Sequence, residues 1–254
     1  MADVVAAGTD RPTRVSWRGL VVQPVVILVI LVAFAVWLNT ADLTPTERTT
    51  LNPSDILALT GQHLYLTLAS TVIVLVIGIP LGVLLTRGPF RRASGGILAV
   101  ANFGQAAPAV GLVVLLAAWL GFTSWAAIVA LVLYAILPVL RNTIIGIESV
   151  DQRLVEAGRG MGMSAASVLF KVELPLAVPV MLAGIRTALV LLVGSAALAT
   201  FIGAGGLGLL ITTGVNLFLP KVLVSGALLI ALLALSIDWV GRIVETVARP
   251  KGLR

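Results

Sequence analysis

Long apolar runs dominate this sequence and restrict its fold more than any other feature. A helix rises 1.5 Å per residue, so roughly 20 apolar residues are needed to cross the hydrocarbon core of a membrane. Only 11% of the residues are charged, whereas a soluble domain carries about 25%. The sequence therefore predicts an all-α, polytopic membrane protein and excludes an ordinary soluble domain. We expect about six transmembrane helices, at residues 20–38, 64–86, 97–120, 122–140, 176–198 and 222–241.

The first run follows three arginines, Arg11, Arg14 and Arg18, as the apolar part of a signal peptide does. It is longer than the roughly 7–15 residues of a secretory signal, and no small-residue cleavage site follows it. We therefore interpret it as a retained first helix.

The basic residues predict the orientation, because cytoplasmic loops are enriched in Lys and Arg. With six spans, one side holds Arg11, Arg14, Arg18, Arg87, Arg91, Arg92, Arg141, Arg153, Arg159, Lys171, Arg242, Arg249, Lys251 and Arg254, and the other holds Arg48 and Lys221. Both termini are then cytoplasmic, as an arm at 1–19 and a tail at 242–254, with an extracytoplasmic loop at 39–62. The basic residues that give the net charge of +6 lie at the ends of the spans and do not form one stripe. This distribution argues against nucleic acid as a partner.

The longest polar stretch on the cytoplasmic side is residues 141–175, which has the pattern of two short helices. Asp151 and Ser164 are suited to cap them. Gly162 offers a turn with positive φ between them. Pro175 is expected to end the second helix and to begin the next span.

The first of these helices has a face of apolar and small residues that another surface can approach closely: Leu154, Val155, Ala157, Gly158 and Met161. A soluble partner can grip such an element and lever the span attached to it. The alternative is an amphipathic connector that lies on the membrane, and the physical pattern alone favours neither.

The spacing of residues in this loop resembles the cytoplasmic signature of ABC importer permeases. That signature is Glu-Ala-Ala, three residues, Gly, nine residues, an aliphatic residue, one residue and Leu-Pro. The matching residues here are Glu156, Ala157, Gly158, Gly162, Val172, Leu174 and Pro175. The sequence departs at Gly158, where Ala is usual, and at Val172, where Ile is usual. The resemblance implies a MetI-like permease fold, with a core at 63–241 and a coupling helix that seats in an ATPase subunit.

Between about residues 63 and 214, the chain is similar to permeases for glycine betaine, choline, carnitine and proline betaine. The stretches that carry this similarity are ANFGQAAPAVGL, LVLYAILPVLRNTIIGIESVD, EAGRGMGM, KVELPLAVPVMLAGIRTAL and GAGGLG. The resemblance implies a bacterial inner-membrane importer with two ATPase copies, a second or related permease, and an extracytoplasmic substrate-binding protein. Permeases for amino acids or methionine-like solutes are the alternative.

Polar residues within the expected spans are candidates for the translocation path. Asn102 and Gln105 lie near one face of the third run, and Pro108 permits a bend there. They line the path or form interhelical hydrogen bonds. Arg186, in the fifth run, faces the inner cavity or snorkels to the cytoplasmic surface, and we favour a structural or snorkelling role. Asp238 and Arg242 are four residues apart, which predicts an ion pair.

Two further features have ordinary interpretations. His63 is the only histidine and is expected at the membrane interface. The glycine-rich segment after the fifth run is expected to form a hinge or tight turn, because no Lys-Ser/Thr follows as in a phosphate loop. Its members are Gly203, Gly205, Gly206 and Gly208.

The chain offers no catalytic chemistry. It has no cysteine and a single histidine, and no nucleophile–base pair, metal site or cofactor site is apparent. An ion-coupled secondary transporter commonly has acidic residues at mid-membrane and an internal repeat, which this sequence lacks. We therefore expect a transport subunit that is not an enzyme and is driven by a separate ATPase.

Overall fold

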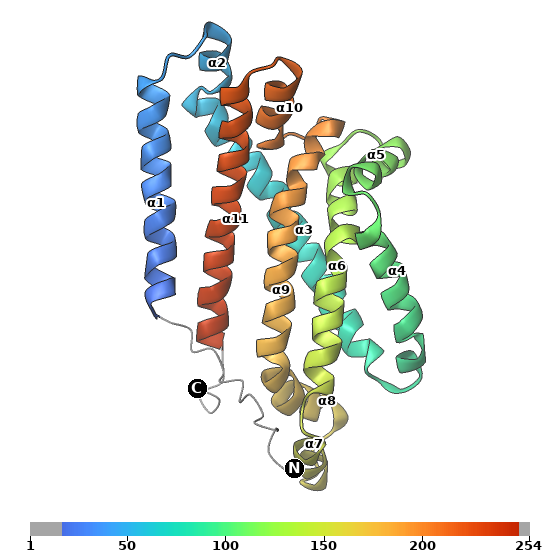
Figure 1. Cartoon of the computed structure of the whole chain (residues 1–254). Coiled ribbons are helices and arrows are strands. Elements are labelled where there is room, and N and C mark those ends of the chain that lie inside the picture. The colour runs from blue at the N-terminus through green and yellow to red at the C-terminus, as the bar shows by residue number, and fades with distance from the viewer. Residues whose placement is uncertain (1–16, 249–254) are drawn as a thin grey trace, which may run out of the picture.

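The structure, a computed structural model, describes residues 17–248, and all regular elements in this range are helical (Figure 1). In chain order they are α1 (Trp17–Thr40), α2 (Pro45–Thr50), α3 (Pro53–Leu85), η1 (Gly88–Ala93), α4 (Ser94–Ala106), α5 (Ala109–Leu120), α6 (Ser124–Glu148), α7 (Gln152–Gly160), α8 (Ala165–Val168), η2 (Leu169–Glu173), α9 (Leu174–Ala196), η3 (Ala197–Ile202), α10 (Gly208–Asn216) and α11 (Pro220–Ala248). The expected all-α class is confirmed.

Within the described residues, 5 helices are long and apolar enough to cross a membrane, or up to 6 if the bent pair α4–α5 is one span. The expectation of about six spans is confirmed with that exception. Residues 97–120 do not form one continuous helix, because α4 and α5 meet at 101°.

Pro108 explains the break between α4 and α5. Ala107 has φ −61° and ψ 145°, the extended conformation that a following proline favours. The helix therefore stops at Ala106, and Pro108 occupies the N-cap of α5. The bend expected at Pro108 is present, and it is sharper than a kink within a span.

The helices extend into the segments that were expected outside the membrane. Residues 39–62 contain α2 and the first turns of α3, which begins after the side chain of Asn52 caps the amide of Ser54. A capping box between Thr44 and Glu47 starts α2. At the other end, α11 is helical to Ala248, well into the expected tail. Most of the expected N-terminal arm lies outside the described residues.

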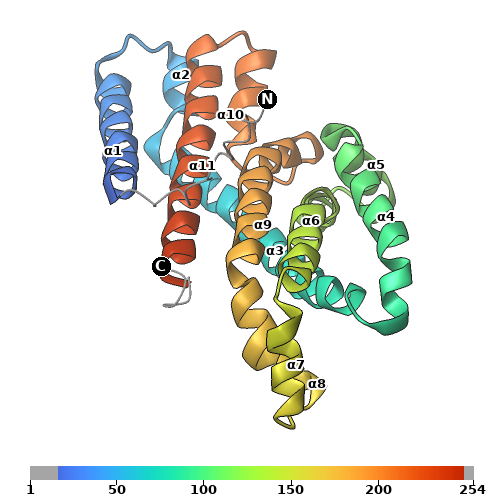
Figure 2. The ribbon, with the colours of Figure 1, turned by 60° about the horizontal axis from the view of Figure 1, so that its bottom comes forward.

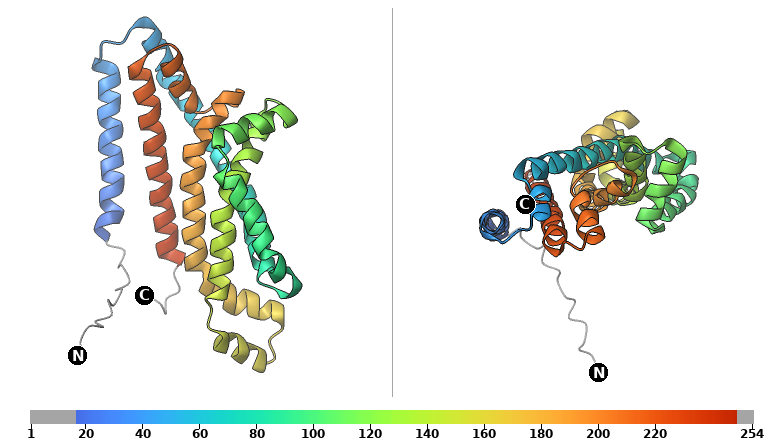
Figure 3. Two further views of the ribbon diagram at one scale, coloured as in Figure 1. Left: turned by 45° about the vertical axis from the view of Figure 1, so that its right-hand side comes forward. Right: turned by 90° about the horizontal axis from the view of Figure 1, so that it is seen from above.

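The helices α6 and α9 form the centre of the bundle, with α3 crossing them obliquely (Figures 1 and 3). Their close approach depends on Gly184, where an added Cβ would lie 2.6 Å from the carbonyl oxygen of Pro138. The α4–α5 pair stands on one side of this centre, and α11 stands on the other. Seen from above, α1 lies at the edge of the bundle beyond α11 (Figure 3).

The two ends of the bundle differ in charge. The end with η1, α7, α8 and the last turn of α11 carries most of the basic residues, including Arg87, Arg159 and Arg242. The opposite end, with α2 and α10, carries Arg48 and Lys221. The first residues of α1 and the last of α11 lie at the basic end. The distribution of charge therefore agrees with the expected topology.

Candidate functional site

The segment with the permease signature forms a helical hairpin that projects from the basic end of the bundle (Figure 2). The Asp151 side chain accepts a hydrogen bond from the Arg153 amide at 2.9 Å and caps α7. Ser164 caps α8 by accepting from the Ser167 amide at 3.2 Å. Gly162 has φ 84° in the turn between them. The expected helices, caps and turn are all confirmed.

One face of the hairpin is turned inward and holds α7 against the helix that follows. Val155 is buried in an apolar cluster with Val150 and Val168, against which Val172 packs. Gly158 is also buried, and an added Cβ would lie 3.4 Å from the Val168 side chain. The small size of Gly158 therefore serves packing within the hairpin, and not the approach of an outside surface as its position suggested.

The other face of α7 is exposed and forms the candidate docking surface. Leu154, Glu156, Ala157 and Met161 all point away from the hairpin interior, and Met161 is 77% exposed. Within residues 17–248, Glu156 makes no ion pair with another side chain. This exposed face, with its apolar side chains and a carboxylate that has no ion-pair partner among the described residues, is available to contact another protein.

The second helix of the hairpin continues directly into a membrane span. The π-turn η2 links α8 to α9, so that residues 165–202 form one span candidate. Pro175 sits in the first turn of α9 and does not end the second helix, contrary to expectation. A π-turn changes the local hydrogen-bond pattern and accommodates the missing proline amide. The hairpin is therefore continuous with α9, with no loop between them.

An ion pair fixes this junction to the neighbouring loop. Glu173, in the π-turn, accepts from both terminal nitrogens of Arg87, with Nη1–Oε1 at 3.0 Å. The Glu173 side chain is 6% exposed and that of Arg87 36% exposed. Arg87 lies between α3 and η1, so the pair ties the α3–α4 connection to the base of α9. Leu174, beside Glu173, packs against a cluster that includes Ile147 and Met181.

The three polar or proline positions of the third run lie near its break. Asn102 and Pro108 are exposed in the single chain, and Gln105 is half-buried. Irregular backbone at membrane depth is tolerated where it contacts protein or lines a water-filled path. No hydrogen bond joins the side chains of Asn102 or Gln105 to another helix of the part of the chain described here. Their role in a path stays a prediction.

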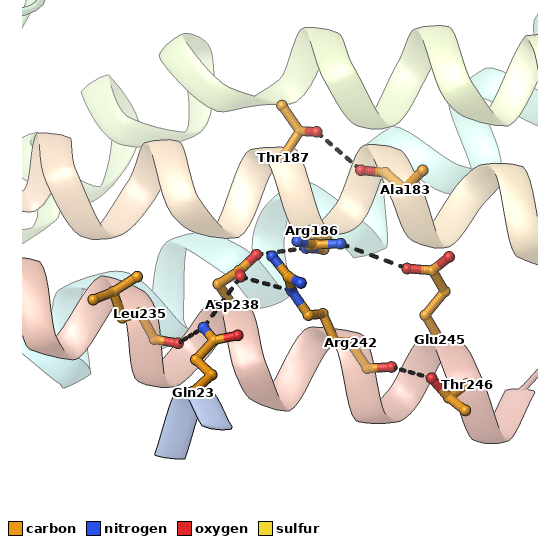
Figure 4. A network of polar contacts seen from close by, with 9 residues as sticks. All are labelled: Gln23, Ala183, Arg186, Thr187, Leu235, Asp238, Arg242, Glu245 and Thr246. Carbon is orange, nitrogen blue, oxygen red and sulfur yellow. Dashed lines mark hydrogen bonds and ion pairs between the residues drawn. The ribbon is translucent and has the colours of Figure 1, made fainter. Parts of the chain in front are cut away.

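Arg186 lies in a polar network between α9, α11 and α1 (Figure 4). Its Nε atom is 2.5 Å from Oδ1 of Asp238, and its Nη1 atom is 3.8 Å from Oε2 of Glu245. Asp238 also accepts from Arg242 at 3.1 Å, which confirms the expected ion pair, and from Gln23 of α1 at 3.4 Å. Arg186 thus links α9 to α11, in agreement with a structural role.

The expectation for His63 is wrong, because this side chain is 0% exposed. Its Nε2 atom lies 2.9 Å from the carbonyl oxygen of Val193, so it joins α3 to α9 inside the protein. The neighbouring Gln62 accepts a hydrogen bond from the amide of Gly206 at 3.0 Å. The glycine-rich segment is a tight turn, as expected, and its backbone packs on α3.

Sequence reasoning does not predict the ion pair between Arg87 and Glu173. Arg87 was used only as one of many basic residues that set the orientation. Glu173 lies inside the signature, between Val172 and Leu174, where the pattern does not specify a residue. A carboxylate in the aliphatic first turns of a span was the available signal, because a buried charge needs a partner.

Comparison with known proteins identifies the family. Residues 78–249 match the family described as "Binding-protein-dependent transport system inner membrane component". The chain belongs to this family. The permease is 41% identical over 203 residues to the glycine betaine/carnitine/choline transport system permease protein OpuCB of Bacillus subtilis, covering 80% of this chain and 93% of that one. It is 39% identical to the osmoprotectant import permease protein OsmW of Salmonella typhimurium, covering 80% and 96%.

A solved structure supports the same fold. The permease resembles a chain of the methionine ABC transporter MetNI in an inward-facing conformation, with a TM-score of 0.65 and 26% identity. The match covers 77% of the permease and 96% of that chain. The resemblance to ABC importer permeases and the MetI-like fold are therefore confirmed, and the chain is the membrane-spanning transport subunit of such a system.

Proposed function

We propose that this permease imports quaternary-ammonium osmoprotectants, with glycine betaine, choline, carnitine and proline betaine as the candidate solutes. The observation that carries the proposal is the 41% identity to a permease for three of these solutes over 80% of the chain. The relative OsmW is named for osmoprotectant import as well. The chain forms half of the path and binds no cofactor.

The exposed face of the hairpin is the contact for a separate ABC ATPase, of which two copies serve one transporter. Leu154, Ala157 and Met161 supply an apolar surface, and Glu156 supplies a charge without a partner in the described chain. When the ATPases close on ATP, the hairpins approach each other. Because α8 continues into α9, each hairpin turns its span and opens the path outward.

The basic end of the bundle is cytoplasmic in this proposal, so both termini are cytoplasmic. The positive-inside distribution supports it, with Arg159 in α7, Lys171 in η2 and Arg87 paired to Glu173 of η2. The end with α2 and α10 then faces an extracytoplasmic binding protein that delivers the solute.

A second permease copy, or a related permease, completes the path. The break at Ala107 and Pro108 supports this step, because exposed irregular backbone requires protein or water against it. Asn102 and Gln105 of α4 then lie beside the path. Arg186 lines it only if the network with Asp238 and Glu245 opens during transport.

Uptake of radiolabelled solutes tests the proposal. Cells without other osmoprotectant carriers are supplied with the permease, its ATPase and its binding protein. We expect saturable uptake of glycine betaine, choline or carnitine that depends on ATP. Uptake driven by an ion gradient without ATP would contradict the class of transporter.

Methionine belongs in the same assay, because the solved relative is a methionine transporter. Uptake of methionine alone would replace the proposed substrate class and leave the importer assignment intact. An assembled complex that imports none of these solutes would contradict the substrate class in the same way.

A pair of matched variants tests the docking face. Glu156→Arg reverses a charge that is exposed on the outward face of α7, so the fold is retained while the ATPase no longer co-purifies and uptake is lost. Glu148→Arg is the control at the same end of the bundle. It breaks only a surface ion pair with Arg91 at 3.4 Å, which is worth about 0–1 kcal/mol. Equal uptake by both variants would exclude α7 as the docking helix.

A further inference from the structure

A cavity that the transport role does not explain lies between α1, α3 and α11, at the end of the bundle that carries α2. Its volume is about 630 Å³. Most of its lining is aliphatic or aromatic, with Leu31, Leu38, Ile56 and Leu232 among the side chains. Along α1 it runs from Leu31 to Leu38, which is about 10 Å of helix. It therefore extends from one membrane surface toward the middle of the bilayer.

Beside the cavity the contacts of α1 are apolar, with Trp37 and Leu38 packed on neighbouring side chains, whereas its hydrogen bonds to α11 lie at its other end. There, Gln23 donates to the carbonyl oxygen of Leu235 at 2.9 Å, and Trp239 donates to the carbonyl oxygen of Leu20 at 2.8 Å. Figure 4 shows Gln23 reaching Leu235 and Asp238. Only 6% of the most apolar 18-residue stretch of α1 is buried. Apolar helices gain little free energy by packing on one another instead of on lipid. Lipid acyl chains can therefore occupy the space between α1 and α3.

One cation stands at the mouth of this cavity. Arg48, on α2, lines the cavity and is exposed. Across the described ranges no carboxylate lies within ion-pair distance of its guanidinium. An arginine at the level of the lipid headgroups is suited to bind a phosphate through two parallel hydrogen bonds.

A neighbouring cavity between α1 and α11, which shares Phe34 with the first, provides a contrast. It has a volume of about 470 Å³ and is also apolar, with Lys221 at its rim. Lys221 is already paired with Glu47 at 3.7 Å and donates to the carbonyl oxygen of Asp42. Its charge is therefore satisfied by the protein, whereas the charge of Arg48 is not.

We infer that the cavity between α1, α3 and α11 is a binding site for one anionic phospholipid. The phosphate pairs with Arg48, and an acyl chain lies against Leu31, Leu38 and Leu232. The lipid fills the space between α1 and α3 and holds the outer half of α1 to the bundle. This inference requires only that the chain spans the membrane and does not depend on the transported solute.

Native mass spectrometry of the assembled transporter tests the headgroup. The complex is taken from bilayers of equal parts phosphatidylglycerol and phosphatidylcholine, and the lipids that remain bound are identified. We expect the wild type to retain phosphatidylglycerol and Arg48→Gln to retain about tenfold less, as loss of a charge-assisted hydrogen bond predicts. Arg92→Gln is the control, since Arg92 is exposed at the other end and lines neither cavity. Equal retention by Arg48→Gln and the wild type would overturn the inference.

A second pair of variants tests the acyl-chain site. Ala35 lines the cavity, so Ala35→Phe fills it and is expected to release the lipid. Val36 is exposed and lines neither cavity, so Val36→Phe is the matched control on the same helix. Undiminished lipid on Ala35→Phe would contradict the site. Because the chain has no cysteine, Ala35→Cys introduces a single thiol into the cavity. If this thiol crosslinks to another protein chain, the cavity is occupied by protein and the lipid assignment is wrong.

Discussion

The α8–α9 span and α1 have similar composition and very different surroundings. The most apolar window of α1 has a mean hydropathy of 2.8 and is 6% buried, whereas that of residues 165–202 has a hydropathy of 2.2 and is 33% buried. The more hydrophobic helix is thus the less buried one. Hydropathy predicts which segments cross a membrane, but small and polar residues decide which of them pack against protein.

The difference between the two helices follows from a few side chains. The base of α9 has the Arg87–Glu173 pair, in which Glu173 is buried, and Gly184 near the middle of α9 admits α6 closely. Most of the specific attachment of α1 comes from Gln23 and Trp239. A helix that transmits force from the hairpin needs the first kind of attachment. A helix at the lipid boundary is held sufficiently by a few hydrogen bonds such as those of Gln23 and Trp239.

The largest expected effect comes from breaking the ion pair at the base of α9. Arg87→Met leaves Glu173 buried without its partner, which costs about 3 kcal/mol. Glu173→Gln leaves an arginine that is 36% exposed and reaches water, so its cost is about 1 kcal/mol. The thermal unfolding midpoints of the purified variants measure both. Equal midpoints for the two variants would show that the cost of breaking the pair does not depend on which partner is left buried.

A smaller loss is expected where α6 and α9 touch. At Gly184 a larger residue meets the backbone of Pro138 and the side chain of Asn142, so Gly184→Leu costs about 2 kcal/mol through overpacking. Gly194→Leu is the control, because nothing lies within 4 Å of an added Cβ there. Thermal unfolding of the two variants is compared. A control as unstable as Gly184→Leu would attribute the loss to glycine replacement in general.

The next effect concerns the network that joins α9 to α11. Arg186→Met removes the contacts to Asp238 and Glu245, but Asp238 keeps Arg242 and Gln23. The expected cost is about 1 kcal/mol, as for polar contacts between membrane helices. Thr187→Val is the control, since its hydroxyl donates only to Ala183 of its own helix (Figure 4). If the unfolding midpoint of Arg186→Met equals that of Thr187→Val, the network does not contribute to holding α9 against α11.

Much of the fold was predictable because its signals are local. The caps at Asp151 and Ser164 and the turn at Gly162 depend on neighbouring residues in the sequence, and all three are present. The predicted apolar face of α7 is present only in part, because Leu154, Ala157 and Met161 are exposed whereas Val155 and Gly158 are buried. Periodicity and charge were sufficient to locate most of the spans.

The features that sequence reasoning missed depend on contacts between distant elements. His63 is buried because Val193 of α9 accepts its hydrogen bond, and nothing near it in the sequence indicates this. The continuation through Pro175 depends on a π-turn. A bend was expected at Pro108, but the apolar character of residues 97–120 concealed that the chain turns there by as much as 101°.

At the α1 boundary we expect a smaller effect than anywhere along α9. Gln23→Leu removes the hydrogen bonds to Leu235 and Asp238 and costs about 0.6 kcal/mol. Asn39→Leu is the control, because that amide donates within α1 to Ala35. Hydrogen–deuterium exchange at the inner end of α1 should be faster in Gln23→Leu only. Faster exchange in both variants would mean that the contact to α11 is not what holds this end.

The smallest effect at neutral pH concerns Glu47 in the segment that joins α1 to α3. Hydrogen bonds from Thr44 lower the pKa of this carboxyl below its usual 4.5. A lowered pKa means that the folded segment prefers the charged form, so its stabilisation is complete above pH 4.5 and is lost as the pH falls through the lowered value. Proteolysis within residues 41–52 should therefore accelerate only in acid. In Glu47→Gln the side chain no longer titrates, so this acceleration should disappear, and an unchanged pH profile would assign the transition to another group.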